Sequence, residues 1–443
     1  MKNPVPVLSN GLGVESVAIL LRWILEPSTR DFDLEDLVVV TAMTGREWPD
    51  TIRNFETHVL PLFREYGIRY VQLGRGGHQE KDGIVVLDDS RDPQKLFASG
   101  AYTLYQELQS AGTVPQYGGA HHCSLKFKAF VIENWLASNI QRSVRHTFGY
   151  NFSESGRVRD SEAAIAARVS FGFNNDELGR VADARSYDHP TRIGHYPLVE
   201  WGWDRARCLS HIHAILGVNW NKSACPFCPF TQISGALTAR QKEFPEETAQ
   251  AMFLERVGLA MNPRAQLYKK QPLYTVVLNS GNQAAIEAFD QLMLTHSWAL
   301  YRVRRIYKAK AIYEESGRRK RVIGFNAGKK GTTSRCVERL EEFASAEAAN
   351  RRLFEIAGNK GLPAHELHGL QYLTLCACQM TYPTREEFLV SAPAVVETKA
   401  RYGVEHFDAQ WAGLAQVGGV DADGRALPML EQLAFPDDLI QIT

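Results

Sequence analysis

The chain has 443 residues, of which 44% are hydrophobic and 23% charged, a composition typical of a folded protein with two or three domains. Lys and Arg together number 50, as do Asp and Glu, so the whole chain is not a polycation for nucleic acid or membranes. No apolar run approaches the roughly 20 residues that span a bilayer. Seven cysteines are too few for a disulfide scaffold, and no signal-like segment follows Met1, so we expect a cytoplasmic protein without a membrane partner.

The first predicted strand, residues 4–8, runs into a glycine-rich turn and then a helix. The turn reads Ser9-Asn10-Gly11-Leu12-Gly13-Val14-Glu15-Ser16. Glycines let a backbone approach a ligand closely, and the free N–H groups at a helix start suit an anion. The turn has no lysine and matches neither the Walker A spacing nor GxGxxG, which disfavours ordinary kinases and dehydrogenases. A turn that binds nothing remains the alternative.

Further strands are predicted at residues 37–42, 70–73 and 144–148, in alternation with helices. This order favours right-handed crossovers and a parallel sheet, which binds ligands beyond the carboxyl ends of its strands. The second strand ends in Met43-Thr44-Gly45-Arg46-Glu47-Trp48-Pro49-Asp50-Thr51, where Pro49 is placed to open a helix. We therefore expect the glycine-rich turn and this second loop to converge.

Four cysteines form a candidate metal site: Cys123, Cys208, Cys225 and Cys228. A C-x-x-C turn such as Cys225–Cys228 presents two thiolates to one metal ion, and Cys123 and Cys208 could complete a tetrathiolate site. A redox pair and inert buried thiols are the alternatives. We expect the other three cysteines, Cys336, Cys376 and Cys378, to have no such role.

Together these segments resemble the phosphoadenosine phosphosulfate reductase-like branch of the PP-loop ATP pyrophosphatase (adenine nucleotide alpha hydrolase-like) superfamily, over about residues 5–235. The glycine-rich turn resembles the PP-loop of that branch, and Thr44-Gly45-Arg46-Glu47 resembles its second-strand motif. Cys123, with Lys128 five residues later, resembles its Cys-Thr-x-x-x-Lys helix start. The remaining similar segments are Gly149-Tyr150-Asn151-Phe152-Ser153-Glu154-Ser155-Gly156-Arg157, the run from Pro197 through Trp203 to Cys208, Lys222-Ser223-Ala224-Cys225, and Cys228-Pro229-Phe230.

The resemblance implies a HUP-type α/β sandwich with a mostly parallel five-stranded sheet. Many enzymes of this superfamily cleave ATP between its α- and β-phosphates, form an adenylate on the substrate and release pyrophosphate. The implied cofactors are ATP with Mg²⁺ and a 4Fe–4S cluster on the four cysteines, with zinc as the alternative. The C-terminal Glu-Cys-Gly motif of the reductases is absent, so phosphosulfate reduction is not expected.

The resemblance also implies roles for individual residues. The implied nucleotide-binding residues are Ser9, Gly11, Gly13, Glu15, Ser16, Thr44 and Gly45. Glu15 stands where the common PP-loop has an Asp that helps to hold magnesium. The implied catalytic residues are Lys128 and Lys222 for phosphate charge, and Glu154 and Arg157 for orienting the substrate. Solvated lysines and a structural salt bridge are the corresponding alternatives.

The second half of the chain has a different composition. We expect an adenine-nucleotide-binding domain at residues 1–235, a helical connector at 236–295 and an α+β accessory domain at 296–443. Twelve Lys and Arg fall within residues 302–335, against two acidic residues, on a predicted hairpin with interspersed aromatic residues. Basic strands with aromatic residues can track the phosphates of DNA or RNA. A solvated sheet face is the alternative.

Three functions are consistent with these features. The first is ATP-dependent adenylation, with or without sulfur transfer, of a nucleic acid or a nucleotide base. The second is a non-catalytic, nucleotide-sensing and nucleic-acid-binding subunit of a modification or defence system, which Glu15 favours. The third is 7-deazapurine synthesis by a ligase of related fold that holds zinc. A homo- or hetero-oligomer is compatible with each.

Overall fold

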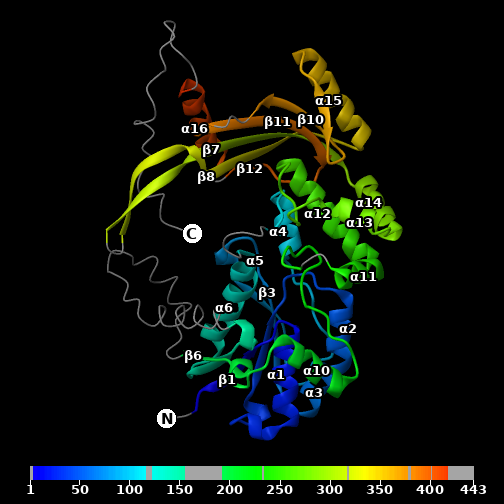
Figure 1. The fold of residues 1–443 in the computed structure, drawn as a ribbon, viewed down its shortest axis with the longest axis vertical. Helices are drawn as coiled ribbons and strands as arrows, with labels where there is room; N and C mark the ends of the chain where they lie inside the picture. The colour runs from blue at the N-terminus through cyan, green and yellow to red at the C-terminus, as the bar shows by residue number, and fades with distance from the viewer. Residues whose placement is uncertain are drawn as a thin grey trace. The chain divides into compact units, whose positions relative to one another are not determined.

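The computed structural model describes residues 3–115, 122–154, 192–231, 234–316, 319–377, 381–400 and 402–417 (Figure 1). The chain divides into two units. Unit 1 comprises Met1–Leu108, Pro115–Ala251 and Leu267–Ile286, and unit 2 comprises Gln109–Val114, Met252–Gln266 and Glu287–Thr443. The helices of the predicted connector, residues 236–295, are divided between the two units.

Unit 1 contains a six-stranded sheet with the order β4-β3-β2-β1-β5-β6. The bounds are β1 Val5–Ser9, β2 Val38–Ala42, β3 Arg69–Arg75, β4 Ile84–Ser90, β5 Val144–Thr147 and β6 Arg192–His195. All neighbouring pairs are parallel except β3 and β4, which are antiparallel. The predicted α/β class and mostly parallel sheet are confirmed. The sheet has six strands rather than five, because β4 adds an antiparallel edge to five parallel strands.

Helices cover both faces of this sheet because successive strand residues point to opposite sides. In β1, Val7 packs in a core with α6, whereas Leu8 packs in a second core with α1 and α10. The described helices that lie wholly in unit 1 are α1 Val14–Leu25, α2 Pro49–His58, α3 Leu60–Glu65, α5 His122–Ser124, α6 Phe130–Asn139, α9 Pro197–Glu200, α10 Arg205–Leu216, α11 Gly235–Glu243 and α13 Leu273–Asn279. Between α5 and α6, Leu125–Ala129 forms a π-helical turn.

Short 3-10 turns occur at Pro27–Thr29, Leu34–Asp36, Glu80–Asp82 and Phe152–Glu154. Three described helices contain residues of both units: α4 Leu104–Ser110, α12 Pro245–Met261 and α14 Gln283–Thr295. None of the described helices combines the length and the apolar character needed to cross a bilayer.

Unit 2 contains an antiparallel six-stranded sheet with the order β12-β8-β7-β11-β10-β9. The bounds are β7 Trp298–Ser316, β8 Arg319–Phe343, β9 Ala364–Leu367, β10 Leu370–Cys376, β11 Thr384–Pro393 and β12 Lys399–Ala400. Helix α15, Ala346–Lys360, packs Leu353 against Leu300 and Leu373 of one face. Helix α16, Val404–Val417, packs Phe407 against Ile306. The region is therefore a sheet with helices, as predicted.

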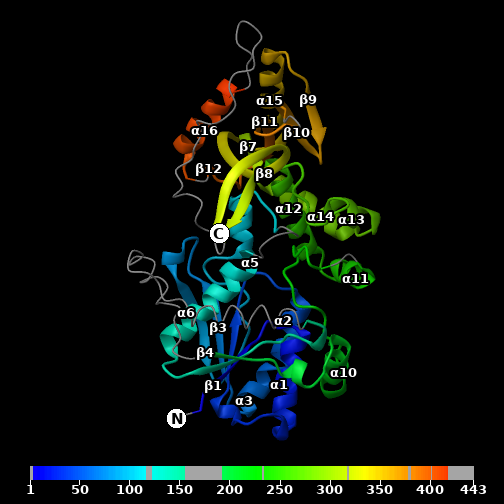
Figure 2. The same ribbon diagram turned by 60° about the vertical axis from the view of Figure 1, so that its left-hand side comes forward.

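The predicted basic hairpin is present as β7 and β8 and is longer than predicted. Its pairing runs from Trp298–Phe343 to Ser316–Arg319, whereas β11 pairs with β7 only as far as Tyr307. Residues 308–316 and 319–334 thus form a two-stranded arm, which projects from the sheet in yellow (Figure 2). We call this segment the distal arm.

Candidate functional site

The glycine-rich turn is shaped by Asn10, which follows β1 directly. Its Oδ1 accepts hydrogen bonds from the Leu12 amide at 2.9 Å and from the Ser16 hydroxyl at 2.8 Å. Leu12 has a φ of 59°, which a side chain adopts rarely, and it is anchored in the core. The Ser16 hydroxyl, a predicted phosphate ligand, is thus used inside the turn. An Asn before a glycine is a known turn former, so the sequence carried a signal for this role.

Helix α1 begins without a side-chain cap. Its N-cap is Gly13, and its first backbone hydrogen bond runs from the Val17 amide to the Gly13 carbonyl at 3.1 Å. The amides that precede Val17 therefore have no acceptor within the helix, and they lie at the positive end of its dipole. A Cβ on Gly149 would lie 3.1 Å from the Ser16 nitrogen, so only glycine leaves this helix start uncrowded.

Ser9, at the end of β1, has a buried partner. Its Oγ lies 2.6 Å from Nε2 of His146, a residue of β5 that is 1% exposed. His146 was not predicted as a functional residue, because an isolated histidine in a strand carries no motif.

Glu15 does not stand free for a metal ion in this structure. Its Oε1 accepts hydrogen bonds from Arg205 Nη1 at 2.6 Å and from Asn151 Nδ2 at 3.5 Å. The Glu154 carboxylate accepts a hydrogen bond from the backbone N–H of Asn151 at 3.2 Å. Glu154 therefore stabilises the segment that contacts Glu15, through its hydrogen bond with Asn151. Arg157 lies outside the described residues.

The second loop lies next to the C-x-x-C turn. Gly45 has a φ of 98°, and a Cβ there would lie 2.3 Å from the Thr103 Cβ, so glycine is required. The Thr44 hydroxyl lies 3.2 Å from the Cys225 Sγ. Cys225 therefore lies at the carboxyl end of β2, the edge where parallel sheets bind their ligands.

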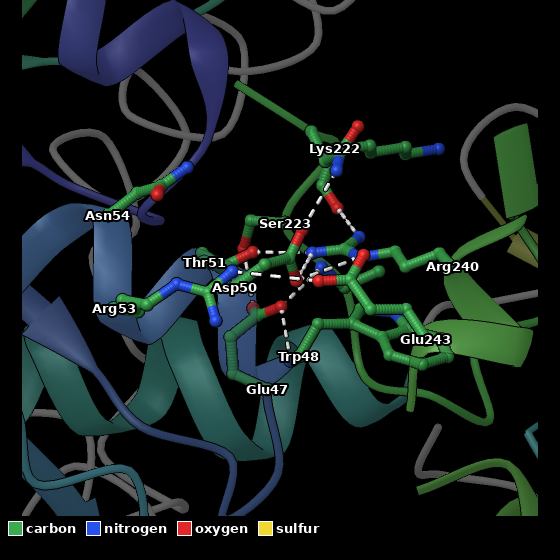
Figure 3. Close-up of polar contacts among 12 residues, drawn as sticks. Glu47, Trp48, Asp50, Thr51, Arg53, Asn54, Lys222, Ser223, Arg240 and Glu243 are labelled. Atoms are coloured by element: carbon green, nitrogen blue, oxygen red, sulfur yellow. Dashed lines mark hydrogen bonds and ion pairs between the residues drawn. The ribbon is translucent and has the colours of Figure 1, made fainter. Parts of the chain in front are cut away.

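Glu47 and Ser223 join the second loop to the glycine-rich turn. Glu47 Oε1 accepts a hydrogen bond from the Ala224 amide at 3.0 Å, and Oε2 lies 2.6 Å from the Ser223 hydroxyl (Figure 3). The same hydroxyl lies 2.7 Å from the Gly11 carbonyl oxygen. Desolvation by burial raises the pKa of Glu47. The predicted convergence of the two loops is therefore confirmed, with Ser223 as the bridge.

A buried ion pair fixes the chain that leads to Cys225. Arg240 of α11 places Nε 2.9 Å and Nη2 2.6 Å from Oδ1 of Asp50, near the start of α2 (Figure 3). Arg240 Nη1 also donates to the Lys222 carbonyl at 2.7 Å. Lys222 lies three residues before Cys225, the first residue of the C-x-x-C turn. The Lys222 ammonium instead donates to the Phe230 carbonyl at 2.9 Å and points away from Glu47 in Figure 3.

Lys128, in the π-helical turn, interacts with several acidic groups of this region. Its charge lowers the pKa values of Glu47, Cys123 and Cys225 against the stronger effect of burial. Burial is the main reason that the pKa of Cys225 rises to about 12. Cys228 also raises the pKa values of Cys123 and Cys225, so these three thiols interact electrostatically. Lys128 therefore acts electrostatically on Glu47 and on two of the predicted metal ligands, Cys123 and Cys225.

Cys208 has different surroundings. It lies on α10, is 0% exposed and belongs to the core that contains α1. Burial, followed by the charges of Glu15 and Asp204, raises its pKa to about 12. In the part of the chain that the structure describes, no three His, Cys, Asp or Glu side chains are gathered as a metal site. This arrangement does not fit a tetrathiolate site, so the 4Fe–4S cluster and the zinc ion stay predictions and no chemical step is derived through them.

Comparisons of the chain with models of protein families, with curated proteins and with solved structures found no match.

Proposed function

We propose that the chain is an ATP-dependent adenylating enzyme with a PP-loop of the phosphoadenosine phosphosulfate reductase-like type in a HUP-type sandwich. The observation that carries this proposal is the pair of contacts of Ser223, 2.7 Å from the Gly11 carbonyl and 2.6 Å from Glu47. These contacts, with Cys225 at 3.2 Å from Thr44, bring the uncapped helix start and Cys225 to one edge of the sheet.

The proposed reaction has the following steps, of which the described residues bear on phosphate binding and on the charge of the leaving group. Backbone amides at the start of α1 hold the phosphates, because they point a positive dipole at an anion. An oxygen atom of the substrate attacks the α-phosphorus of ATP, the bond to the bridging oxygen of the β-phosphate breaks, and pyrophosphate leaves. Lys128 stabilises the charge that develops on this leaving group. Mg²⁺ bound with ATP would supply further stabilisation of that charge. A second nucleophile, such as a sulfur donor, then displaces AMP from the substrate, a nucleic acid or a nucleotide base.

Lys128 and Lys126 offer a matched test, because both lie in the same π-helical turn. Lys126 forms an ion pair with Glu107 at 2.6 Å, so its charge is engaged elsewhere. We expect Lys128→Met to weaken binding of α,β-methylene ATP with Mg²⁺, measured by calorimetry, by at least about tenfold, and Lys126→Met to leave it unchanged. A wild-type protein that binds no adenine nucleotide would refute the proposed function.

A second candidate function is binding of nucleic acid without turnover. The ion pair of Glu15 with Arg205 favours it, since this carboxylate is already neutralised where a magnesium ligand would stand. The distal arm also favours it, with Tyr313 51% and Phe325 67% exposed between lysines. At the base of the hairpin, in contrast, arginines predicted as phosphate contacts are paired with acids: Arg302 with Glu387, Arg304 with Glu338 and Asp408, and Arg305 with Glu386.

This candidate predicts a steep salt dependence that resides in the distal arm. Replacing Lys310 and Lys329 together by alanine should lower the slope of log affinity against log salt by about 0.7–0.9 per lost phosphate contact. Lys360→Ala, an exposed lysine at the end of α15, is the control and should leave the slope unchanged. Filter binding of a single-stranded DNA measures both. An unchanged slope in the double variant would exclude the distal arm as the interface.

A further inference from the structure

A chain of four polar residues leads from the glycine-rich turn into the interior of unit 1. The Ser9 Oγ lies 2.6 Å from Nε2 of His146, the Arg192 guanidinium contacts Nδ1 of the same ring, and Arg192 also contacts the Glu133 carboxylate. His146 is 1% exposed, and the side chains of Arg192 and Glu133 are 9% and 10% exposed. These residues come from four elements: β1, β5, β6 and α6.

The register of the sheet explains why these side chains meet. His146 is paired with Val7, and Ser9 lies two residues after Val7, so both side chains lie on the face that carries Val7. Arg192 is paired with Val144, two residues before His146, and therefore lies on this face too. Val7 and Val144 pack in the core formed with α6. The four polar groups thus share the α6 face, below the end of β1.

The proton positions follow from the chemistry of the side chains. A guanidinium group has donors only, so Nδ1 of His146 must accept a hydrogen bond from Arg192 and carries no hydrogen. The neutral ring then carries its hydrogen on Nε2 and donates it to the Ser9 Oγ. The ring is also held by stacking on Phe148, with centroids 4.3 Å apart. Ser9 is therefore an acceptor toward the interior, and its own hydroxyl hydrogen is left for another acceptor.

We propose that His146 is a positioning residue: held in its Nε2–H form by Arg192, it leaves the hydroxyl hydrogen of Ser9 to donate to a phosphate oxygen of a nucleotide at the glycine-rich turn. This inference rests on the proposed function. In the part of the chain that the structure describes, the Ser9 hydroxyl has no other hydrogen-bond partner, so the phosphate would be its acceptor. Glu133 balances the charge of Arg192, which keeps the guanidinium in place.

The experiment uses the full chain and α,β-methylene ATP with Mg²⁺. We expect Ser9→Ala and His146→Phe each to raise Kd by about tenfold, the effect of one hydrogen bond to a charged group. Because His146 acts through Ser9, the double variant should bind no more weakly than Ser9→Ala alone. His146→Gln, whose amide can accept from Arg192 and donate to Ser9, should retain near wild-type affinity. Thermal unfolding of each variant checks that it is folded.

A second measurement reads the proton position directly, without nucleotide. The two ring ¹⁵N shifts of His146, assigned by their loss in His146→Gln, should identify the neutral Nε2–H tautomer. A hydrogen on Nδ1, or additive effects of Ser9→Ala and His146→Phe, would overturn the inference while nucleotide binding by the wild type stands. A wild type that binds no nucleotide overturns the proposed function, and the role of Ser9 toward phosphate with it.

Discussion

Replacing Arg240 by methionine should destabilise unit 1, because it leaves the buried carboxylate of Asp50 without its positively charged partner. The side chains of Arg240 and Asp50 are each 7% exposed, and two guanidinium nitrogens of Arg240 lie within 2.9 Å of Asp50 Oδ1. Breaking a buried ion pair from one side costs about 3–5 kcal/mol, since the remaining charge has lost both water and its partner.

Two features of the site reduce this cost. Asp50 is the second residue of α2, where the helix dipole stabilises a negative charge by about 0.3–1 kcal/mol. Asn221 Nδ2 also continues to donate to Asp50 Oδ2 at 2.8 Å. We therefore expect a loss in the free energy of unfolding near the lower limit, about 3 kcal/mol. Adding Asp50→Asn to Arg240→Met removes the unpaired negative charge and should restore part of the lost free energy of unfolding.

Urea unfolding, followed by tryptophan fluorescence, measures the change; Trp48 lies under the Arg240 guanidinium, whose central carbon is 4.9 Å from the ring centroid. Arg53→Met is a matched control, because the Arg53–Glu243 ion pair joins the same two helices at 3.6 Å but is 62% and 55% exposed (Figure 3). It should change stability by less than about 1 kcal/mol. If Arg240→Met costs no more than Arg53→Met, or if Asp50→Asn deepens the loss, the reasoning is wrong.

Three further predictions concern stability. Gly45→Ala should lower the free energy of unfolding by urea by at least about 2 kcal/mol, because a Cβ at its φ of 98° is strained and would clash with Thr103. Gly11→Ala is the control and should cost less, because open space surrounds that position. Hydrogen bonds from Arg145 lower the pKa of Asp31. Asp31→Asn should therefore lower the free energy of unfolding by about 0.5 kcal/mol near neutral pH. This difference from wild type should vanish toward about pH 2, where the wild-type carboxyl is protonated. Ser345→Ala removes the N-cap of α15 and should lower the unfolding free energy of unit 2 by about 1 kcal/mol; no change would show that this cap is dispensable.

The sequence by itself determined the fold class and the order of the first elements. Strands at residues 4–8, 37–42, 70–73 and 144–148 could be recognised because central parallel strands are buried on both faces and read as apolar runs. The edge strands β4 and β6 were not predicted. Among the described strands β6, which reads Arg-Ile-Gly-His, stands at the edge of the sheet, and it lacks the apolar run that marks a central strand.

Local patterns also placed the glycine-rich turn and the second loop at the same edge, because parallel strands end there. They did not identify Asn10, His146 or Arg240, whose partners lie on other elements. The nearest clue was the Asn before Gly11, which marks a turn but not what the turn holds.

Only the tertiary structure decided which polar side chains meet. Ser223 reaches Glu47 and Gly11 across more than 170 residues of sequence, and Cys225 reaches Thr44 across 181. The arginines at the base of the basic hairpin show the same limit. The register sets Arg305 opposite Glu386 and Arg304 opposite Glu387, so a segment that is basic in sequence is neutralised where it enters the sheet. The sequence of one strand shows its own charges, but the packing of the whole sheet determines which acidic residues of the neighbouring strands lie opposite them.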